Sequence, residues 1–267
     1  MLPRSAESPG SRHVALVTGG SHRLGREIAL HLAGQGWDVA VHCHRSKLAA
    51  AEVCAQAQAL GAQAHAVCAD LSIAAAVRTV LPQAVAALGR VDAVVNNAAL
   101  FDHDDAQHFS VDAAQRHYQV NTIAPVLLAQ ALHAHVTERG AQGCVVNLLD
   151  QKLSNPDPDY LSYTLSKAAL QAATVALAQA LAPALRVVGV APGLMLPSGS
   201  MTDDEFDSVH SRTPLRRGST PLDVAQAVRF ALDARAMTGT TLLVDGGQHL
   251  AGTGRDVLFV ARAESAQ

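Results

Sequence analysis

The fold is decided by residues 14–25, which read VALVTGGSHRLG. The opening VALV is a short, continuous apolar run, typical of a strand covered on both faces of a parallel sheet. Glycines at positions 19, 20 and 25 let the chain turn tightly and approach a ligand closely. A helix that begins after such a turn directs its free N–H groups and its positive end at a phosphate. Strand, glycine-rich turn and helix in this order predict a dinucleotide-binding unit.

The same alternation of strands and helices continues along the chain. Strands are expected at Val14–Thr18, Asp38–His42, Ala64–Cys68, Ala93–Asn96, Cys144–Leu148, Arg186–Val190 and Thr241–Val244. Helices are expected at Arg26–Gly34, Leu48–Leu60, Ile73–Leu88, Val111–Glu138, Leu161–Ala182 and Pro221–Leu232. This order predicts an α/β fold: a single-domain, Rossmann-type, doubly wound parallel sheet of about seven strands with helices on both faces.

A single core is compatible with a chain of 267 residues, of which 49% are apolar. Residues 1–12 contain no apolar run, so we expect a disordered lead-in rather than a signal peptide, followed by a single domain at 13–267. The least regular stretch, near 194–215, is expected to be a substrate loop. Its acids at Asp203, Asp204 and Glu205 leave two interpretations open: a mobile lid, or a solvated acidic loop with a short helix.

Composition argues against several classes of protein. The net charge of −3 suggests neither nucleic-acid binding nor attachment to a membrane surface, and no stretch has the composition of a membrane span. The chain has four cysteines without a Cys-x-x-Cys pattern, so they are expected to be reduced, as in a cytoplasmic protein. Thirteen histidines show no recognisable metal-ligand spacing, and we expect no metal site.

The end of the second strand predicts which nicotinamide cofactor is bound. It reads HCHRS, residues 42–46, and no acid occurs between Asp38 and Glu52. An NAD enzyme commonly places an acid here for the ribose 2′-hydroxyl. Arg45 instead offers a planar fork for a 2′-phosphate, and Ser46 adds a donor, which favours NADPH. The alternative is a solvated arginine at a strand end, and His44 can either add charge or cap the loop.

A tyrosine and a lysine predict the catalytic chemistry. Tyr163 and Lys167 are four residues apart, so on a helix their side chains share one face. An ammonium beside a phenol favours the phenolate, and we expect Lys167 to lower the pKa of Tyr163 from about 10, which gives a proton donor that works near neutral pH. Tyr160 is the rival, but the acidic, proline-rich stretch at 155–159 favours a loop there.

These motifs, in this order, resemble the short-chain dehydrogenase/reductase family over roughly Val14 to Leu250. The turn has the form Thr-Gly-x-x-x-Arg-x-Gly, with Arg23 in place of the family's middle glycine, and this variant resembles the pteridine reductases, of the dihydromonapterin or dihydrofolate reductase type. The resemblance implies NADP(H) as the cofactor. The cofactor-binding residues that it implies are Gly19, Ser21, His22, Arg23, Leu24, Gly25, His44, Arg45, Ser46, Asp70, Leu71, Asn97, Ala98, Ala99, Tyr163, Lys167, Pro192 and Gly193.

The resemblance also assigns the catalytic residues. Tyr163 is expected to be the proton donor, Lys167 its partner and a ribose ligand, and Asn121 the residue that helps to position the lysine through a water. Asp150 stands where most members have a serine that hydrogen-bonds the substrate oxygen. An ionised carboxylate would repel the alkoxide that forms when a ketone is reduced. Reduction of a C=N bond needs a proton on nitrogen instead, which a carboxyl group can help to deliver.

Together these residues predict the substrate. Arg23, Phe101, Asp150 and Tyr163 are the expected substrate-binding residues, with Phe101 stacking on a pterin ring. Ala99 departs from the pattern, because a serine commonly meets the pterin there. We predict an NADPH-dependent reductase of a dihydropterin or dihydrofolate. Two alternatives stay open: a reductase of another carbonyl, such as a 3-oxoacyl thioester or a sugar, and a catalytically silent NADPH-binding sensor.

Two long alanine-rich helices suggest an assembly. The helices expected at Val111–Glu138 and Leu161–Ala182 carry more apolar surface than one sheet face should cover. The resemblance implies that such helices pair across a two-fold axis, so a homotetramer is expected. The tail at 252–267 contains VLFV, residues 257–260, and either docks on a neighbouring subunit or is disordered.

Overall fold

A parallel sheet forms the centre of the computed structural model, which describes residues 12–197 and 201–265. Its seven strands have the order β3-β2-β1-β4-β5-β6-β7, and every pair is parallel. The strands are β1 (Val14–Val17), β2 (Asp38–Cys43), β3 (Ala64–Cys68), β4 (Ala93–Asn96), β5 (Gly143–Leu148), β6 (Leu185–Pro192) and β7 (Thr241–Val244). The predicted fold class is confirmed, and each expected strand is present.

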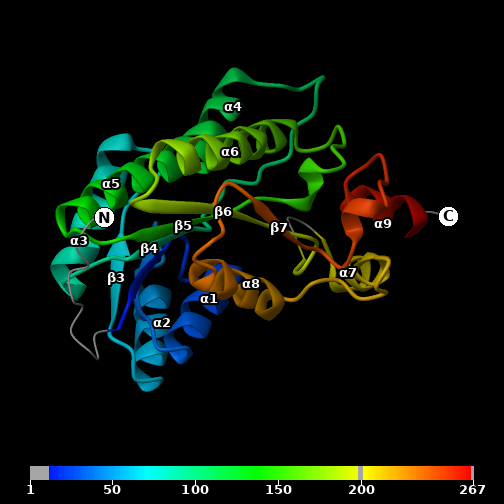
Figure 1. Ribbon diagram of the computed structural model, residues 1–267. Coiled ribbons are helices and arrows are strands. Elements are labelled where there is room, and N and C mark those ends of the chain that lie inside the picture. The colour runs from blue at the N-terminus through cyan, green and yellow to red at the C-terminus, as the bar shows by residue number, and fades with distance from the viewer. Residues whose placement is uncertain (1–11, 198–200, 266–267) are drawn as a thin grey trace.

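Helices cover both faces of this sheet (Figure 1). They are α1 (Arg23–Gly34), α2 (Lys47–Ala59), α3 (Ala74–Leu88), α4 (Val111–Tyr118), α5 (Ala124–Glu138), α6 (Leu161–Ala180), α7 (Asp203–His210), α8 (Pro221–Asp233) and α9 (Val257–Ser265). In Figure 1, α1, α2 and α8 lie below the sheet, whereas α4, α5 and α6 lie above it and α3 lies at the left, packed against α5. The two short helices α7 and α9 lie together at one end of the sheet.

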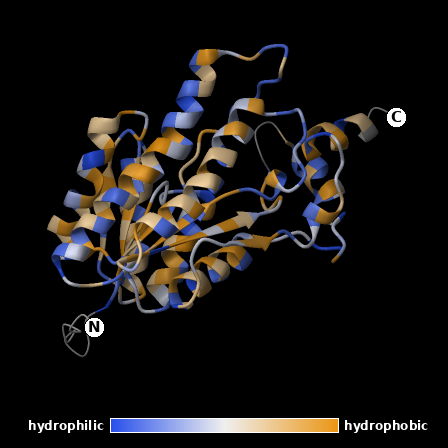
Figure 2. Cartoon of the chain, turned by 45° about the horizontal axis from the view of Figure 1, so that its top comes forward, coloured by the Kyte–Doolittle hydropathy of each residue, from blue (hydrophilic) through white to orange (hydrophobic). Residues whose placement is uncertain are grey.

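Two apolar layers hold the helices on the sheet. One joins the strands to α1, α2 and α8, and includes Ile28, Leu32 and Val228. The other joins the opposite face to α3, α5 and α6, and includes Leu16, Leu128 and Leu132. The strands are accordingly apolar along their length, whereas the helices have hydrophobic and hydrophilic sides (Figure 2). Because both faces are covered, the strands read as continuous apolar runs rather than alternating ones.

The prediction of one continuous helix at Val111–Glu138 is wrong, because the structure has an interruption within this range. A turn of π-helix at Gln119–Ile123 separates α4 from α5. The backbone N–H of Ala124 there donates to the carbonyl of Gln119, five residues earlier. One residue is thus inserted into the helical register, as is frequent at functional sites. The insertion lies at Asn121, one of the predicted site residues.

Two segments near the carboxyl end were left open by the sequence and are helical. The acids of the 194–215 loop begin α7, where Thr202 and Glu205 form a capping box. The tail forms α9, and Leu258 and Ala261 pack against Met201 and Val209. Residues 198–200 of the predicted substrate loop lie outside the described part of the chain. No helix in residues 12–197 and 201–265 has the length and apolar character needed to cross a membrane.

One residue of the predicted lead-in, Arg12, contacts the domain. The predicted lead-in at 1–12 lies outside the described residues except for Arg12. Its guanidinium donates to the carbonyls of Ala33, Gly36 and Gly61, and its Nε lies 3.3 Å from an Asp38 carboxylate oxygen. Disorder is therefore the wrong prediction for Arg12.

Candidate active site

The glycine-rich turn lies where the strand order reverses, between β1 and β4. Ligands of open α/β sheets bind at this point, outside the carboxyl ends of the strands. Gly19 has a φ of +62°, and a Cβ at Gly25 would collide with the carbonyl of Gly19 and lie 2.6 Å from the Asn97 side chain. That side chain donates to the carbonyl of Thr18 over 2.9 Å. The turn therefore needs glycine at both positions and leaves its backbone open to a pyrophosphate.

The ends of β2 and β3 bring three of the predicted cofactor-binding residues together. His44 and Arg45 are exposed after β2, and the His44 Nε2 lies 3.4 Å from an Asp70 carboxylate oxygen. Asp70 also accepts from the N–H and hydroxyl of Ser72, which hold the pKa of its carboxyl below the usual range. Arg45 is thus presented to solvent beside a fixed turn, where its fork can meet a phosphate.

His42 is a site residue that the sequence did not single out. It is buried inside β2, its Nδ1 accepts from the backbone N–H of Gly19 over 3.2 Å, and its Nε2 lies 3.1 Å from the carbonyl of Ala69. These contacts require the neutral ring with the proton on Nε2. Burial lowers the pKa of His42 from 6.5 to about 4. The signal in the sequence was a polar residue inside an apolar strand that leads to the cofactor loop.

His42 should therefore make folding pH-dependent. The unfolded chain binds a proton below pH 6.5, whereas folded His42 does so only near pH 4. The stabilising contribution of neutral His42 is complete above pH 6.5 and falls as the pH drops towards 4, by about 3 kcal/mol in all. Urea unfolding of the wild type and of His42→Gln at pH 7, 5.5 and 4.5 measures this effect. The difference between their free energies of unfolding should become smaller as the pH is lowered. A difference that is constant with pH would contradict the contacts described.

Tyr163 is placed by the way in which helix α6 begins. The Asp104 carboxylate accepts from the backbone N–H and the hydroxyl of Ser162 at the first turn. Tyr160 precedes the helix with a φ of +55°, so it lies outside the helix, as the sequence predicted. The side chains of Tyr163 and Lys167 are both buried on the face of α6 towards β5. There the Tyr163 hydroxyl donates to Asp150 Oδ2 over 2.8 Å.

The predicted lowering of the Tyr163 pKa is wrong for this arrangement. Burial, together with the charge of Asp150 and its hydrogen bond, raises the pKa of Tyr163 well above 10. The Lys167 ammonium donates to the carbonyl of Leu148 over 2.6 Å, and it lies 5.7 Å from the centre of the Tyr163 ring. Burial lowers the pKa of Lys167 to about 8. Tyr163 therefore stays protonated at neutral pH.

Asp150 is held in place by two hydrogen bonds, one of which is the bond from Tyr163. Its Oδ1 accepts from the backbone N–H of Lys152 over 2.8 Å, at the start of the 3-10 turn Gln151–Leu153. Burial raises the pKa of the Asp150 carboxyl, against the effect of its two hydrogen bonds and of Lys167. Two acids with raised pKa values thus share a hydrogen bond, which is the environment of a proton-donating site.

Asn121 pins two segments of the site together. Its side-chain amide donates to Ser166 Oγ in α6 and to the carbonyl of Leu100, each over 2.9 Å, and its Oδ1 accepts from the N–H of Leu100 over 2.7 Å. The Asn121 side chain therefore links the segment after β4 to α6 by hydrogen bonds. The structure thus supports a positioning role for this side chain, while the predicted water contact with Lys167 stays a prediction.

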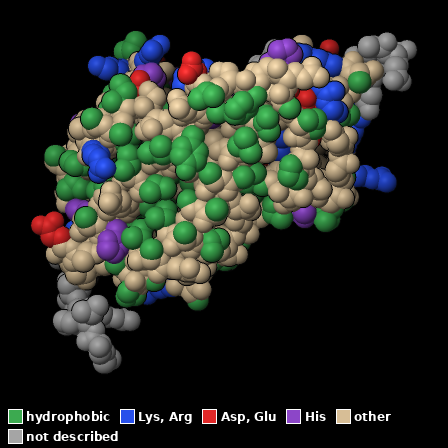
Figure 3. Space-filling model, turned by 90° about the horizontal axis from the view of Figure 1, so that it is seen from above, with side chains coloured by type: hydrophobic (Ala, Val, Ile, Leu, Met, Phe, Trp, Pro, Cys, Tyr) green, Lys and Arg blue, Asp and Glu red, His purple; other side chains and the backbone are tan. Residues whose placement is uncertain are grey.

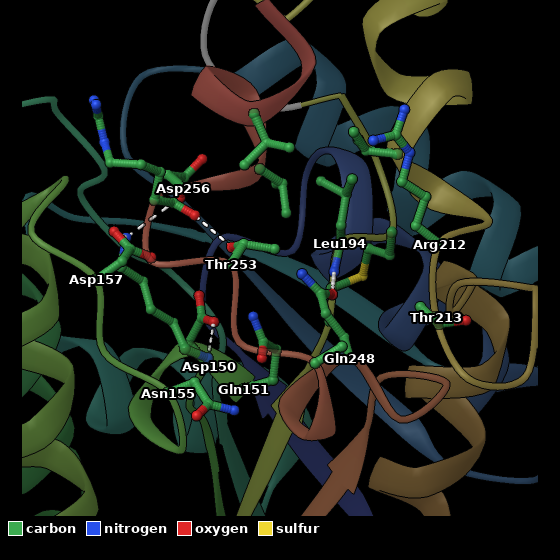
Figure 4. A pocket seen from close by; sticks show the side chains of 18 of the residues that line it. Asp150, Gln151, Asn155, Asp157, Leu194, Arg212, Thr213, Gln248, Thr253 and Asp256 are labelled. Carbon is green, nitrogen blue, oxygen red and sulfur yellow. Dashed lines mark hydrogen bonds and ion pairs between the residues drawn. The ribbon is translucent and has the colours of Figure 1, made fainter. Parts of the chain in front are cut away.

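A cavity of about 320 Å³ opens above Asp150 and Tyr163. Its lining includes Arg23, Phe101, Asp150, Tyr163 and Gly193, which brings together the predicted substrate residues. In Figure 4, Asp157 and Asp256 lie on one side of the cavity and Arg212 and Thr213 on the other. Such a volume suits a small organic substrate.

Two aromatic rings, Phe101 and Tyr163, and the side chain of Arg23 line the cavity beside Asp150. Phe101 stacks on Tyr160, with ring centres 4.2 Å apart, and meets the Tyr163 ring edge-on at 4.6 Å. One face of Phe101 is therefore already covered by a protein ring. Arg23 has a φ of +48° and donates to the carbonyl of Pro197 over 2.5 Å, so it joins the cofactor turn to the substrate loop.

The turn after β6 depends on a residue that the sequence analysis missed. The Gln248 side chain accepts from the backbone N–H of Leu194 over 2.9 Å, and a Cβ at Gly193 would lie 2.7 Å from the same oxygen. Gly193 is thereby held at the edge of the cavity, while the part that Pro192 and Gly193 take in binding the cofactor stays a prediction. No sequence signal marked Gln248, because it lies about fifty-five residues further along the chain. Among the residues described, no group of three or more His, Cys, Asp or Glu side chains is arranged to hold a metal.

Known proteins resemble the chain over most of its length. The family model described as short chain dehydrogenase matches residues 13–207. A putative ketoacyl reductase of granaticin polyketide synthase from Streptomyces violaceoruber is 36% identical, over 89% of this chain and 96% of its own. Pteridine reductase 1 from Leishmania tarentolae is 33% identical, with the same coverage. The crystal structure of FolM alternative dihydrofolate reductase 1 from Brucella canis, complexed with NADP, is 38% identical, with a TM-score of 0.84 over 90% of this chain and 96% of that chain.

Proposed function

Because the chain belongs to the short-chain dehydrogenase family, we propose that it is an NADPH-dependent reductase of the C=N bond of a dihydropterin or dihydrofolate. One observation carries the proposal: the Tyr163 hydroxyl donates to Asp150, and both residues line a cavity that Arg23 and Phe101 also line. The similarity to pteridine reductase 1 and to FolM alternative dihydrofolate reductase 1 supports it.

The reaction adds one hydride to carbon and one proton to nitrogen. NADPH, when bound, supplies the hydride. Tyr163 gives the proton, and Asp150 accepts hydrogen bonds from the amino or ring N–H groups of the substrate. The raised pKa values of both side chains keep a proton on the pair at neutral pH. Solvent returns that proton after each turnover.

The glycine-rich turn and the end of β2 support NADPH as the cofactor. The turn leaves no room for a side chain at Gly25, and Arg45 is exposed beside it. Arg45→Ala should raise the KM for NADPH by about tenfold, because a charged donor to the 2′-phosphate is lost. The KM for NADH should not change. Steady-state kinetics with both nucleotides checks this, and an equal effect on both would assign Arg45 to another role.

The direct test is an assay of NADPH oxidation with candidate substrates. Purified protein should oxidise NADPH when dihydrobiopterin, dihydromonapterin or dihydrofolate is added. It should oxidise NADH more slowly with the same substrates. A 3-oxoacyl thioester serves as the competing substrate, because the similarity to the putative ketoacyl reductase favours carbonyl reduction as the second candidate. Turnover of the thioester without turnover of any dihydropterin would reverse the assignment.

We also propose a homotetramer in the cytoplasm. Hydrophobic side chains gather over the face formed by α4, α5 and α6 (Figure 3), and the exposed ones include Val111, Tyr118, Leu165 and Val175. Contiguous apolar surface of this kind marks an interaction site. The four cysteines are free, which supports a reducing compartment.

Leu165 tests the assembly. Its side chain is 53% exposed on α6, so Leu165→Glu should leave the fold intact while placing a charge in the subunit interface. Light scattering should give a mass of four 27.8 kDa chains for the wild type and a smaller assembly for the variant. A monomeric wild type would refute the tetramer.

A further inference from the structure

Lys152 is a buried cation beside the catalytic carboxylate. Its side chain is 6% exposed, and its ammonium lies 2.7 Å from Asp157 Oδ1 and 3.3 Å from Asp256 Oδ2. The same ammonium lies 5.4 Å from the centre of the Tyr160 ring. A buried ammonium needs such partners, since an unpaired one would lose its hydration without compensation. The proton-transfer pair of Asp150 and Tyr163 does not use this side chain.

The two carboxylates come from segments far apart in the chain. Asp157 belongs to the loop between the 3-10 turn and α6, whereas Asp256 directly precedes α9. Without a cation between them, two negative charges would face each other in the cavity wall, where Asp157 and Asp256 lie close together in Figure 4. Lys152 is therefore the group that lets the tail lie against this loop.

A second contact beside the first fixes the same tail segment. The Arg255 guanidinium donates to both carboxylate oxygens of Asp159, over 2.8 and 2.9 Å, and the backbone N–H of Asp256 donates to one of them over 2.9 Å. Val257 and Val260 then line the cavity, and Leu258 is buried against α7. The tail thus forms one wall of the cavity.

We propose that Lys152 is a positioning residue that latches residues 255–260 over the cavity and so determines how tightly the substrate is held. The turn that carries this latch also holds Asp150, through the backbone N–H of Lys152. When the latch is open, the tail must become ordered before the substrate can bind. The apparent Kd for the substrate then equals the intrinsic Kd divided by the fraction of protein in the closed state, so the apparent affinity is lower. The chemical step is left in place. The effect on the substrate rests on the proposed function, whereas the latch itself does not.

Two variants test the latch. Lys152→Met keeps the apolar stem and the backbone N–H to Asp150, and removes only the charge. Asp256→Asn removes the opposite charge and keeps an oxygen for the N–H of Leu258, which Asp256 now accepts over 3.1 Å. Arg229→Met is the matched control, because it breaks an ion pair with Asp233 within α8, a helix that contributes no residue to the latch or to the cavity lining. Asp256→Asn decides the matter if Lys152→Met does not fold.

Two measurements are made on each full-length protein. Hydrogen exchange read by mass spectrometry should be faster at residues 255–263 in both latch variants and unchanged there in the control. The KM for the dihydropterin should rise by roughly tenfold, with kcat and the Kd for NADPH close to wild type. Unchanged exchange at the tail overturns the latch, and a joint loss of kcat and NADPH binding overturns the positioning role. If no dihydropterin is turned over by the wild type, the proposed function fails, and the exchange result still decides the latch.

Discussion

Replacing Tyr163 by phenylalanine is expected to lower kcat by roughly 10²- to 10⁴-fold, the usual contribution of a positioned acid. The variant loses the hydroxyl that donates to Asp150 and keeps the ring that packs against Phe101. Binding of NADPH should persist, because the glycine-rich turn and Arg45 are untouched. Stopped-flow kinetics under single-turnover conditions separates hydride transfer from product release.

Tyr160→Phe is the matched control for this experiment. It removes a hydroxyl three residues earlier from a ring that stacks on the same Phe101. Its kcat should stay close to that of the wild type, because Tyr160 lies outside α6 and does not line the cavity. Equal losses in the two variants would mean that ring packing, and not proton donation, had been measured. Wild-type kcat in Tyr163→Phe would favour the NADPH-binding sensor.

Asp150→Ser is expected to reduce dihydropterin turnover by at least about 10²-fold, and it distinguishes C=N from C=O reduction. The serine hydroxyl can still accept from the N–H of Lys152, which Asp150 now holds, so the 3-10 turn should persist. What is lost is the carboxylate that meets the substrate nitrogens. A reductase of ketones should tolerate the change, since serine is the residue that donates to a substrate oxygen. Parallel assays with a dihydropterin and a 3-oxoacyl thioester measure both outcomes.

The same variant changes the titration of Tyr163. The charge of Asp150 and its hydrogen bond raise the pKa of Tyr163 in the wild type. Removing both should shift that pKa downward, although burial still holds it above the ordinary value. Difference absorbance of tyrosinate between pH 8 and 12 detects the shift, with Tyr163→Phe as the blank. Unchanged dihydropterin turnover together with an unchanged titration would reduce Asp150 to a cap of the 3-10 turn.

Local patterns in the sequence were sufficient for the architecture. The apolar runs that became β1 to β7 are short and continuous because helices cover both sheet faces, and that pattern is visible without coordinates. The glycines of residues 14–25 mark positions in the turn where a side chain is excluded, and the collision that a Cβ at Gly25 would make shows why. The spacing of Tyr163 and Lys167 fixes a shared helical face in the same local way.

Only the tertiary structure decided how these groups act on one another. The pKa of Tyr163 is raised rather than lowered, because burial and Asp150 outweigh a lysine that instead donates to the carbonyl of Leu148. The spacing of residues along a helix predicts which face of the helix a side chain lies on. It does not predict which group that side chain contacts. The roles of His42 and Lys152 were hidden for the same reason. Their partners, Gly19 and Asp256, lie 23 and 104 residues away, and only folding brings them within hydrogen-bonding distance.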